Sequence, residues 1–83
     1  MIATVIKIQK KKSRYGGFFY YCFFKSVDNQ KSYYTCLYPK MRNFARWKKV
    51  MDIGTTLSNL KLVKGKDKLV DADSKFQVVE EKD

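Results

Sequence analysis

A run of aromatic side chains near the start of the chain is the clearest candidate for a binding surface. Six rings fall within the eight residues Phe18–Lys25, directly after Gly16 and Gly17. Side chains alternate between the two faces of a strand, so this run places rings on both faces. Only one face of a half-buried strand packs into a core. Rings on the other face are available to stack on planar groups of a partner.

Basic residues accompany the rings. Residues 1–50 hold twelve basic residues and one acidic residue, whereas residues 51–83 hold six and seven. Phe76 is the only ring after Trp47. Exposed rings alone would indicate a protein interface, and cations alone would suit any polyanion. The two together favour single-stranded nucleic acid, because free bases stack on rings while phosphates attract cations.

The composition is that of one small folded domain. The chain has 83 residues, a formal net charge of +10 and 45% hydrophobic residues, which is enough apolar surface to fold. It has no histidine, and Cys22 and Cys36 cannot form a four-ligand zinc site by themselves. The segment Asp71–Ser74 is more typical of a turn than of a metal loop. No nucleophile is accompanied by a general base, so we expect no enzyme, no metal and no cofactor.

The cysteines and the N-terminal segment bear on the compartment. Both cysteines lie in strand-like runs, where a free cysteine packs as a small apolar residue rather than forming a disulfide. Residues 1–12 lack a basic segment ahead of their apolar run, which argues against a signal peptide. No apolar run approaches the roughly 20 residues that a membrane span requires. We therefore expect free thiols and a cytoplasmic protein.

Hydrophobic patterning predicts an all-β domain of five strands with one helix. The expected strands are Ile2–Gln9, Phe18–Ser26, Ser32–Tyr38, Thr55–Val63 and Leu69–Val79. Phe44, Trp47 and Met51 recur at helical spacing, which predicts a helix over Lys40–Met51 with these residues facing the core. The cations on the rest of this helix are expected to face solvent. A basic loop, Lys10–Gly17, joins the first two strands.

This order of elements matches the five-stranded Greek-key barrel called the OB-fold, with its helix between the third and fourth strands. An SH3-like barrel is the rival fold, but it does not normally carry a helix at that place. We expect the barrel to span residues 1–79. Residues 80–83 would then form a short charged tail.

Two segments, RYGGFFYYCFFK and SYYTCLYPKMRNFARWKKVMDIGTTL, resemble the corresponding run in OB-fold single-stranded-DNA-binding proteins of the phage and bacterial type. In that family a glycine pair opens the second strand and an aromatic third strand leads into a helix. A G-x-x-L/V pattern then opens the fourth strand. The resemblance implies binding of single-stranded DNA during replication or recombination, in a phage or plasmid setting. It also implies a homo-oligomer, because family members gain affinity by linking several sites.

Lys25 and Leu37 indicate which face of each aromatic strand is buried. Lysine rarely points into a core unpaired, so the Lys25 side of Phe18–Ser26 should be the outer face, with Phe24 in the core. Leu37 is the best core residue of Ser32–Tyr38, which turns Cys36 and two tyrosines outward. The expected binding residues are the outer rings and the cations around them. They are Lys10, Lys11, Lys12, Arg14, Tyr15, Phe19, Tyr21, Phe23, Lys25, Tyr34 and Tyr38.

Two other functions fit the same pattern. An RNA-binding protein of the cold-shock kind would use the same stacking and phosphate contacts. A protein-interaction subunit would instead dock its aromatic face on another protein, with little dependence on salt. In either case the strand Ile2–Gln9 is a candidate edge for pairing between two copies of the chain.

Overall fold

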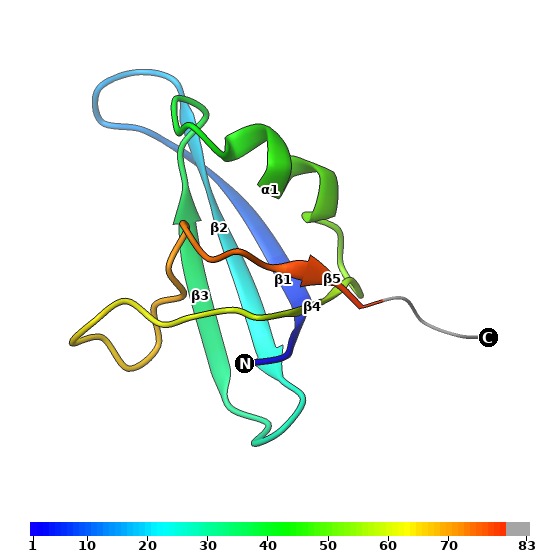
Figure 1. Ribbon diagram of the computed structural model, residues 1–83. Coiled ribbons are helices and arrows are strands. Elements are labelled where there is room, and N and C mark those ends of the chain that lie inside the picture. The colour runs from blue at the N-terminus through cyan, green and yellow to red at the C-terminus, as the bar shows by residue number, and fades with distance from the viewer. Residues whose placement is uncertain (80–83) are drawn as a thin grey trace.

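The computed structural model describes residues 1–79, which form five strands and one helix. In chain order the elements are β1 (Ala3–Lys12), β2 (Phe18–Ser26), β3 (Ser32–Leu37), α1 (Phe44–Val50), β4 (Thr56–Ser58) and β5 (Gln77–Val78). The strands make one antiparallel sheet in the order β3-β2-β1-β4-β5 (Figure 1). The domain is therefore mostly β, as the sequence predicts, and its sheet is open rather than a closed barrel.

The meander of β1, β2 and β3 makes most of the sheet. β1 lies opposite β2 along its whole length, whereas β4 pairs only with Ala3 and Thr4 of β1. β5 in turn pairs with two residues of β4. The prediction that Ile2–Gln9 is an edge strand is therefore wrong for the start of β1, whereas Lys7, Ile8 and Gln9 pair only with β2 among the described strands.

The chain between β4 and β5 folds back against the free edge of β3. The amide of Tyr34 donates to the carbonyl of Lys68 at 2.9 Å, and the amide of Val70 donates to the carbonyl of Tyr34 at 2.7 Å. These bonds pair Tyr34 with Leu69 in a parallel bridge. On its other side Val70 forms an antiparallel bridge with Leu62. The bridges are isolated, so they link the β3 edge to the β4 side without completing a ladder.

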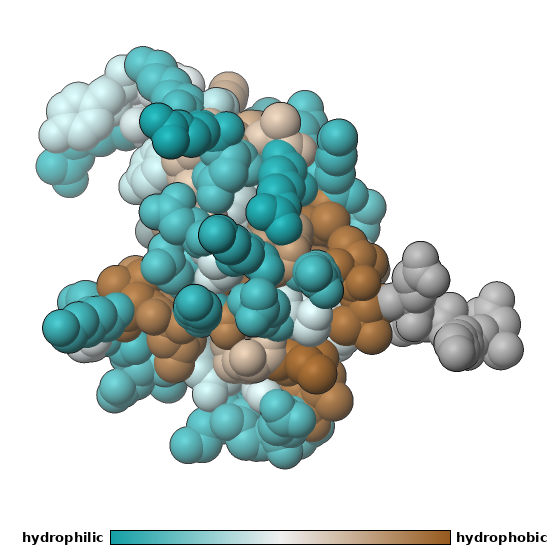
Figure 2. All heavy atoms as spheres, in the orientation of Figure 1, coloured by the Kyte–Doolittle hydropathy of each residue, from teal (hydrophilic) through white to brown (hydrophobic). Residues whose placement is uncertain are grey.

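The helix and residues 56–79 cover one face of the meander (Figure 1). Trp47 of α1 is 1% exposed, and its ring centroid lies 6.2 Å from Phe24 and 4.3 Å from Phe76. Its indole Nε1 donates to the carbonyl of Ala72 at 2.7 Å, which satisfies the one polar group of the side chain. The predicted core positions of Trp47 and Phe24 are thus confirmed. Figure 2 shows this covered side of the molecule, where hydrophilic side chains surround a few hydrophobic patches.

The largest boundary differences in the first half of the chain are at the end of β1 and the start of α1. β1 runs to Lys12 instead of Gln9, because Lys10, Lys11 and Lys12 all pair with β2. The connecting hairpin loop is therefore only residues 13–17. The helix is shorter than predicted and begins at Phe44, since the four residues before Phe44 form turns instead of helix.

The second half of the chain contains much less strand than predicted. β4 ends at Ser58, and the next residue, Asn59, has a positive φ of 63° that breaks the extended backbone. The predicted last strand is interrupted at Asp71–Ser74, where the amide of Asp73 donates to Asp71 Oδ1 at 2.9 Å. Such side-chain-to-backbone bonds compete with strand pairing. The predicted charged tail, residues 80–83, lies outside the described residues.

Candidate nucleic-acid interface

The uncovered face of the meander is the face that the sequence assigns to binding. Cys22 and Phe24 of β2 are fully buried, and Lys25 is exposed. On β3, Leu37 is fully buried while Tyr34 is 36% exposed. The predicted orientation of both strands is therefore confirmed, including the outward position of Cys36, which is partly exposed.

Five outer rings form one continuous group, which we call the ring cluster: Phe19, Tyr21, Phe23, Tyr34 and Tyr38. The β2–β3 register places Phe23 directly opposite Tyr34 and Tyr21 opposite Cys36. This alignment is what lets rings from two strands meet.

The distances within the ring cluster are those of interacting aromatic pairs. Along β2, the centroids of Phe19 and Tyr21 are 5.2 Å apart and those of Tyr21 and Phe23 are 6.2 Å apart. Across the strands, Tyr34 lies 6.3 Å from Tyr21 and 6.4 Å from Phe23. Phe19 stacks on Tyr38 at 5.6 Å with an interplanar angle of 28°. Rings held by such contacts form a preorganised apolar surface, which costs little entropy when a planar partner binds.

A β-bulge in β1 brings a lysine to this surface. The pairing passes from Val5 opposite Phe24 to Lys7 opposite Phe23, so Ile6 is an extra residue. Val5 stays buried, whereas Lys7 moves to the outer face. The ammonium of Lys7 lies 5.9 Å from the centroid of Phe23, within cation–π distance. Sequence reasoning missed Lys7, because simple alternation places it on the same face as Val5.

The same register separates the three consecutive lysines at the end of β1. Lys11 lies opposite Phe19 and shares the outer face with the ring cluster. Lys10 and Lys12 lie opposite Tyr20 and Phe18, on the other side of the sheet. The ammonium of Lys10 lies 4.3 Å from the centroid of Phe18. The prediction of one basic loop beside the rings is therefore wrong for these lysines, which belong to a strand and alternate between its faces.

The β1–β2 hairpin stands at one end of the ring cluster. Tyr15 is 94% exposed at its tip, and Arg14 beside it is also exposed. A cavity of about 250 Å³ is lined by Ser13, Arg14, Tyr15, Phe19 and Tyr38. The structure thus brings Arg14 and Tyr15 next to two members of the ring cluster, as the sequence predicts.

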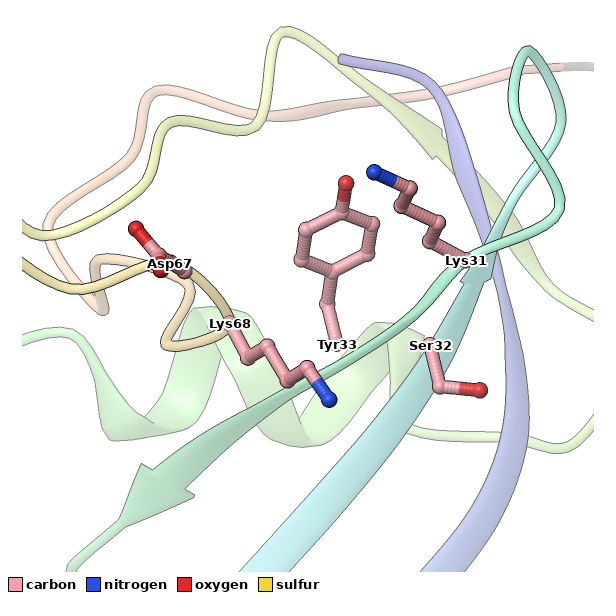
Figure 3. A pocket seen from close by; sticks show the side chains of 5 residues that line it. All are labelled: Lys31, Ser32, Tyr33, Asp67 and Lys68. Atoms are coloured by element: carbon pink, nitrogen blue, oxygen red, sulfur yellow. The ribbon is translucent and has the colours of Figure 1, made fainter.

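Lys25 stands at the opposite end of the ring cluster, opposite Ser32. Beyond Ser32 lies a cavity of about 650 Å³, lined by Lys31, Ser32, Tyr33, Asp67 and Lys68. Figure 3 shows Lys68 of the β4–β5 connection extending toward the β3 residues, while the neighbouring Asp67 side chain points away from them. None of the ring cluster lines this cavity, and its one ring, Tyr33, is only 8% exposed. The charged side chains that line this cavity are two lysines and one aspartate.

The two thiols differ in environment. Burial raises the pKa of Cys22 to about 12, so that this thiol stays protonated. Cys36 lies on the outer face, where its thiol is the main cause that raises the pKa of Tyr38. Both cysteines are free, as predicted.

The helix cations lie apart from the ring cluster. Lys48 and Lys49 are exposed, in line with the prediction of a solvated face. Arg46 differs, because its guanidinium donates to the carbonyl of Phe76 and lies 4.5 Å from the centroid of that ring. Arg46 therefore ties α1 to the segment that carries Phe76.

Within residues 1–79, no group of three or more His, Cys, Asp or Glu side chains is placed to hold a metal ion. In the same part of the chain, no helix has the length and apolar character needed to cross a membrane. No protein-family model, curated protein or solved structure matches this chain.

Proposed function

We propose that this protein binds single-stranded DNA without strong sequence preference, by stacking bases on the ring cluster. The observation that carries the proposal is the contact of five outward rings across β2 and β3, with Lys7, Lys11 and Lys25 on the same face. Rings offer stacking to every base, and cations neutralise phosphates irrespective of sequence.

The chemistry of the face favours a single strand over a duplex. Base pairs in a duplex hide the flat faces of the bases inside the stack, so the rings would have nothing to stack on. A face with cations but no rings would suit the duplex backbone equally well. Here the rings lie on β2 and β3 or directly after β3, and the cations lie beside them on β1 and at the Lys25 end of β2.

The proposed fold behind this function is an incomplete OB-type barrel. Leu69–Val70 bridges β3 on one side and Leu62 on the other, and β4 pairs with β1. These pairings, if extended, would join the free edge of β3 to the β4 side of the sheet. In OB-folds the face of the second and third strands binds oligonucleotides, which is the face that carries the ring cluster here.

The test is a fluorescence anisotropy titration with labelled oligo-dT, oligo-rU and duplex DNA of equal length at two salt concentrations. We expect oligo-dT to bind more tightly than duplex. If Lys7, Lys11, Lys25 and Arg14 contact three or four phosphates, log affinity should fall with log salt at a slope of about −2 to −3. Equal or tighter binding of duplex would contradict the proposal. A slope near zero would indicate a protein-docking face, and tighter binding of oligo-rU would indicate an RNA-binding protein.

A further inference from the structure

The β1–β2 hairpin carries an aromatic side chain that does not pack into the core. Tyr15 is 94% exposed, so its ring contributes almost nothing to the core. Tyrosine is intermediate in how often it is buried, so a tyrosine exposed almost completely has little packing of its own. This ring is held next to a cavity instead.

The backbone beneath Tyr15 is well fixed. The amide of Ser13 donates to the carbonyl of Gly17 at 2.9 Å, and the amide of Gly16 donates to the carbonyl of Ser13 at 3.2 Å. The amide of Tyr15 itself donates to Ser13 Oγ at 3.2 Å. Gly16 and Gly17 have φ angles of 91° and 75°, a conformation that glycine adopts at little cost. The turn is therefore closed by its own hydrogen bonds while the Tyr15 side chain stays free.

Two rings of the ring cluster line the same cavity as Tyr15. Phe19 and Tyr38, which stack on each other at 5.6 Å, both line it, together with Ser13 and Arg14. Its volume of about 250 Å³ lies below the roughly 300–1,000 Å³ of pockets for drug-sized ligands. The space suits one small planar ring system, with the Arg14 guanidinium at hand for an attached anion.

We propose that the hairpin is a base clamp, in which one nucleobase of a bound single strand enters between Tyr15 and the Phe19–Tyr38 pair while Arg14 contacts a neighbouring phosphate. This inference rests on the proposed function, and it adds a site where a base has rings on two sides. Elsewhere on the ring cluster, bases would stack on one side only.

The test compares Tyr15→Ala and Tyr15→Phe with the wild-type protein in titrations with oligo-dT. We expect Tyr15→Ala to weaken binding about 5- to 150-fold, as the loss of one stacking ring should. Tyr15→Phe keeps the ring and should bind like the wild type. Since Tyr15 is almost fully exposed, neither variant should change the melting temperature.

An abasic oligonucleotide of equal length and charge identifies the cause of the loss. If Tyr15 stacks on a base, the penalty of Tyr15→Ala should disappear when the ligand has no bases. A penalty that persists on the abasic ligand would overturn the clamp, because the variant would then act through the phosphates or the shape of the hairpin.

A Tyr15→Trp variant gives a direct signal. Trp47 is 1% exposed, so its emission should stay constant, and the new indole should be quenched when oligo-dT binds. Wild-type affinity of Tyr15→Ala, combined with weakened binding by Tyr34→Ala, would overturn the clamp and leave the proposed function standing. If the wild-type protein does not prefer oligo-dT to duplex, the proposed function itself fails.

Discussion

The ammonium of Lys7 on β1 lies 5.9 Å from the ring centroid of Phe23 on the neighbouring strand β2. The contact exists because Ile6 is bulged out of the β1–β2 ladder, which turns Lys7 away from the buried side of Val5. A cation and a ring held together in this way can serve the phosphate and the base of the same nucleotide.

Removal of Lys7 should therefore weaken binding through charge. We expect Lys7→Ala to lower the affinity for oligo-dT and to reduce the magnitude of the salt slope by about 1, because one phosphate contact is lost. Lys10→Ala is the matched control, since Lys10 lies on the same strand but on the opposite face. Titrations at several salt concentrations measure both quantities. Equal changes in the salt slope for the two variants would show that binding does not depend on which face of β1 carries the lysine.

The rings of the cluster should contribute to binding more than to stability. We expect Tyr21→Ala, Phe23→Ala and Tyr34→Ala each to weaken binding of oligo-dT by about 1–3 kcal/mol. All three side chains lie on the uncovered face, so the variants should still fold. Thermal melts recorded beside the titrations check this.

Phe24→Ala is the control for the rings. Phe24 is fully buried against Trp47, and its loss should lower the free energy of unfolding by about 3–5 kcal/mol. If Phe24→Ala is harmless while Tyr21→Ala unfolds the protein, the assignment of inner and outer faces is inverted. If all four variants fold and bind normally, the ring cluster is not a stacking surface.

Cys36 should report occupancy of the ring cluster. It is partly exposed opposite Tyr21, whereas Cys22 is buried with its pKa raised to about 12. Because the thiolate is the reactive form, a thiol reagent should modify Cys36 first in the native protein. Bound oligo-dT should slow this reaction, and the Cys36→Ser variant should show no fast-reacting thiol. Unchanged kinetics at saturating oligo-dT would place the ligand elsewhere.

Cys22 should make the protein less stable in alkali. Its pKa rises from 9.0 to about 12 on burial, so the folded state keeps a proton that the unfolded state loses. The stabilisation is complete below about pH 9 and decreases by up to about 1.4 kcal/mol per unit as the pH rises toward 12. Urea unfolding of the wild type and of Cys22→Ala, near neutral pH and at about pH 10.5, measures the difference. The advantage of the wild type should shrink at the higher pH; a constant advantage would contradict the prediction.

Arg46 should stabilise the fold without contributing to binding. Its guanidinium contacts both the carbonyl and the ring of Phe76, so we expect Arg46→Ala to lower the free energy of unfolding by about 1–2 kcal/mol. Lys48→Ala, on the exposed side of the same helix, should have almost no effect. Affinity for oligo-dT should be the same for both. Weaker binding by Lys48→Ala would instead bring α1 into the interface.

The sequence alone determined the features that depend on neighbouring residues. The bounds of β2 follow from a dense aromatic run between two glycines and a turn, and they agree with the structure to the residue. Lys25 and Leu37 indicate which face of β2 and of β3 is buried, because lysine is rarely buried unpaired and leucine is usually buried. The core position of Trp47 follows in the same way from helical spacing.

Only the tertiary structure decided which residues meet on the uncovered face. The Ile6 bulge moves Lys7 to the face of the rings and determines that Lys11, rather than Lys10 and Lys12, shares that face. The bulge depends on how β1 pairs with β2. The isolated bridges of Leu69–Val70 likewise depend on a segment far along the chain from β3. Such choices are set by hydrogen bonds and packing between distant segments, which hydrophobic periodicity within one strand does not encode.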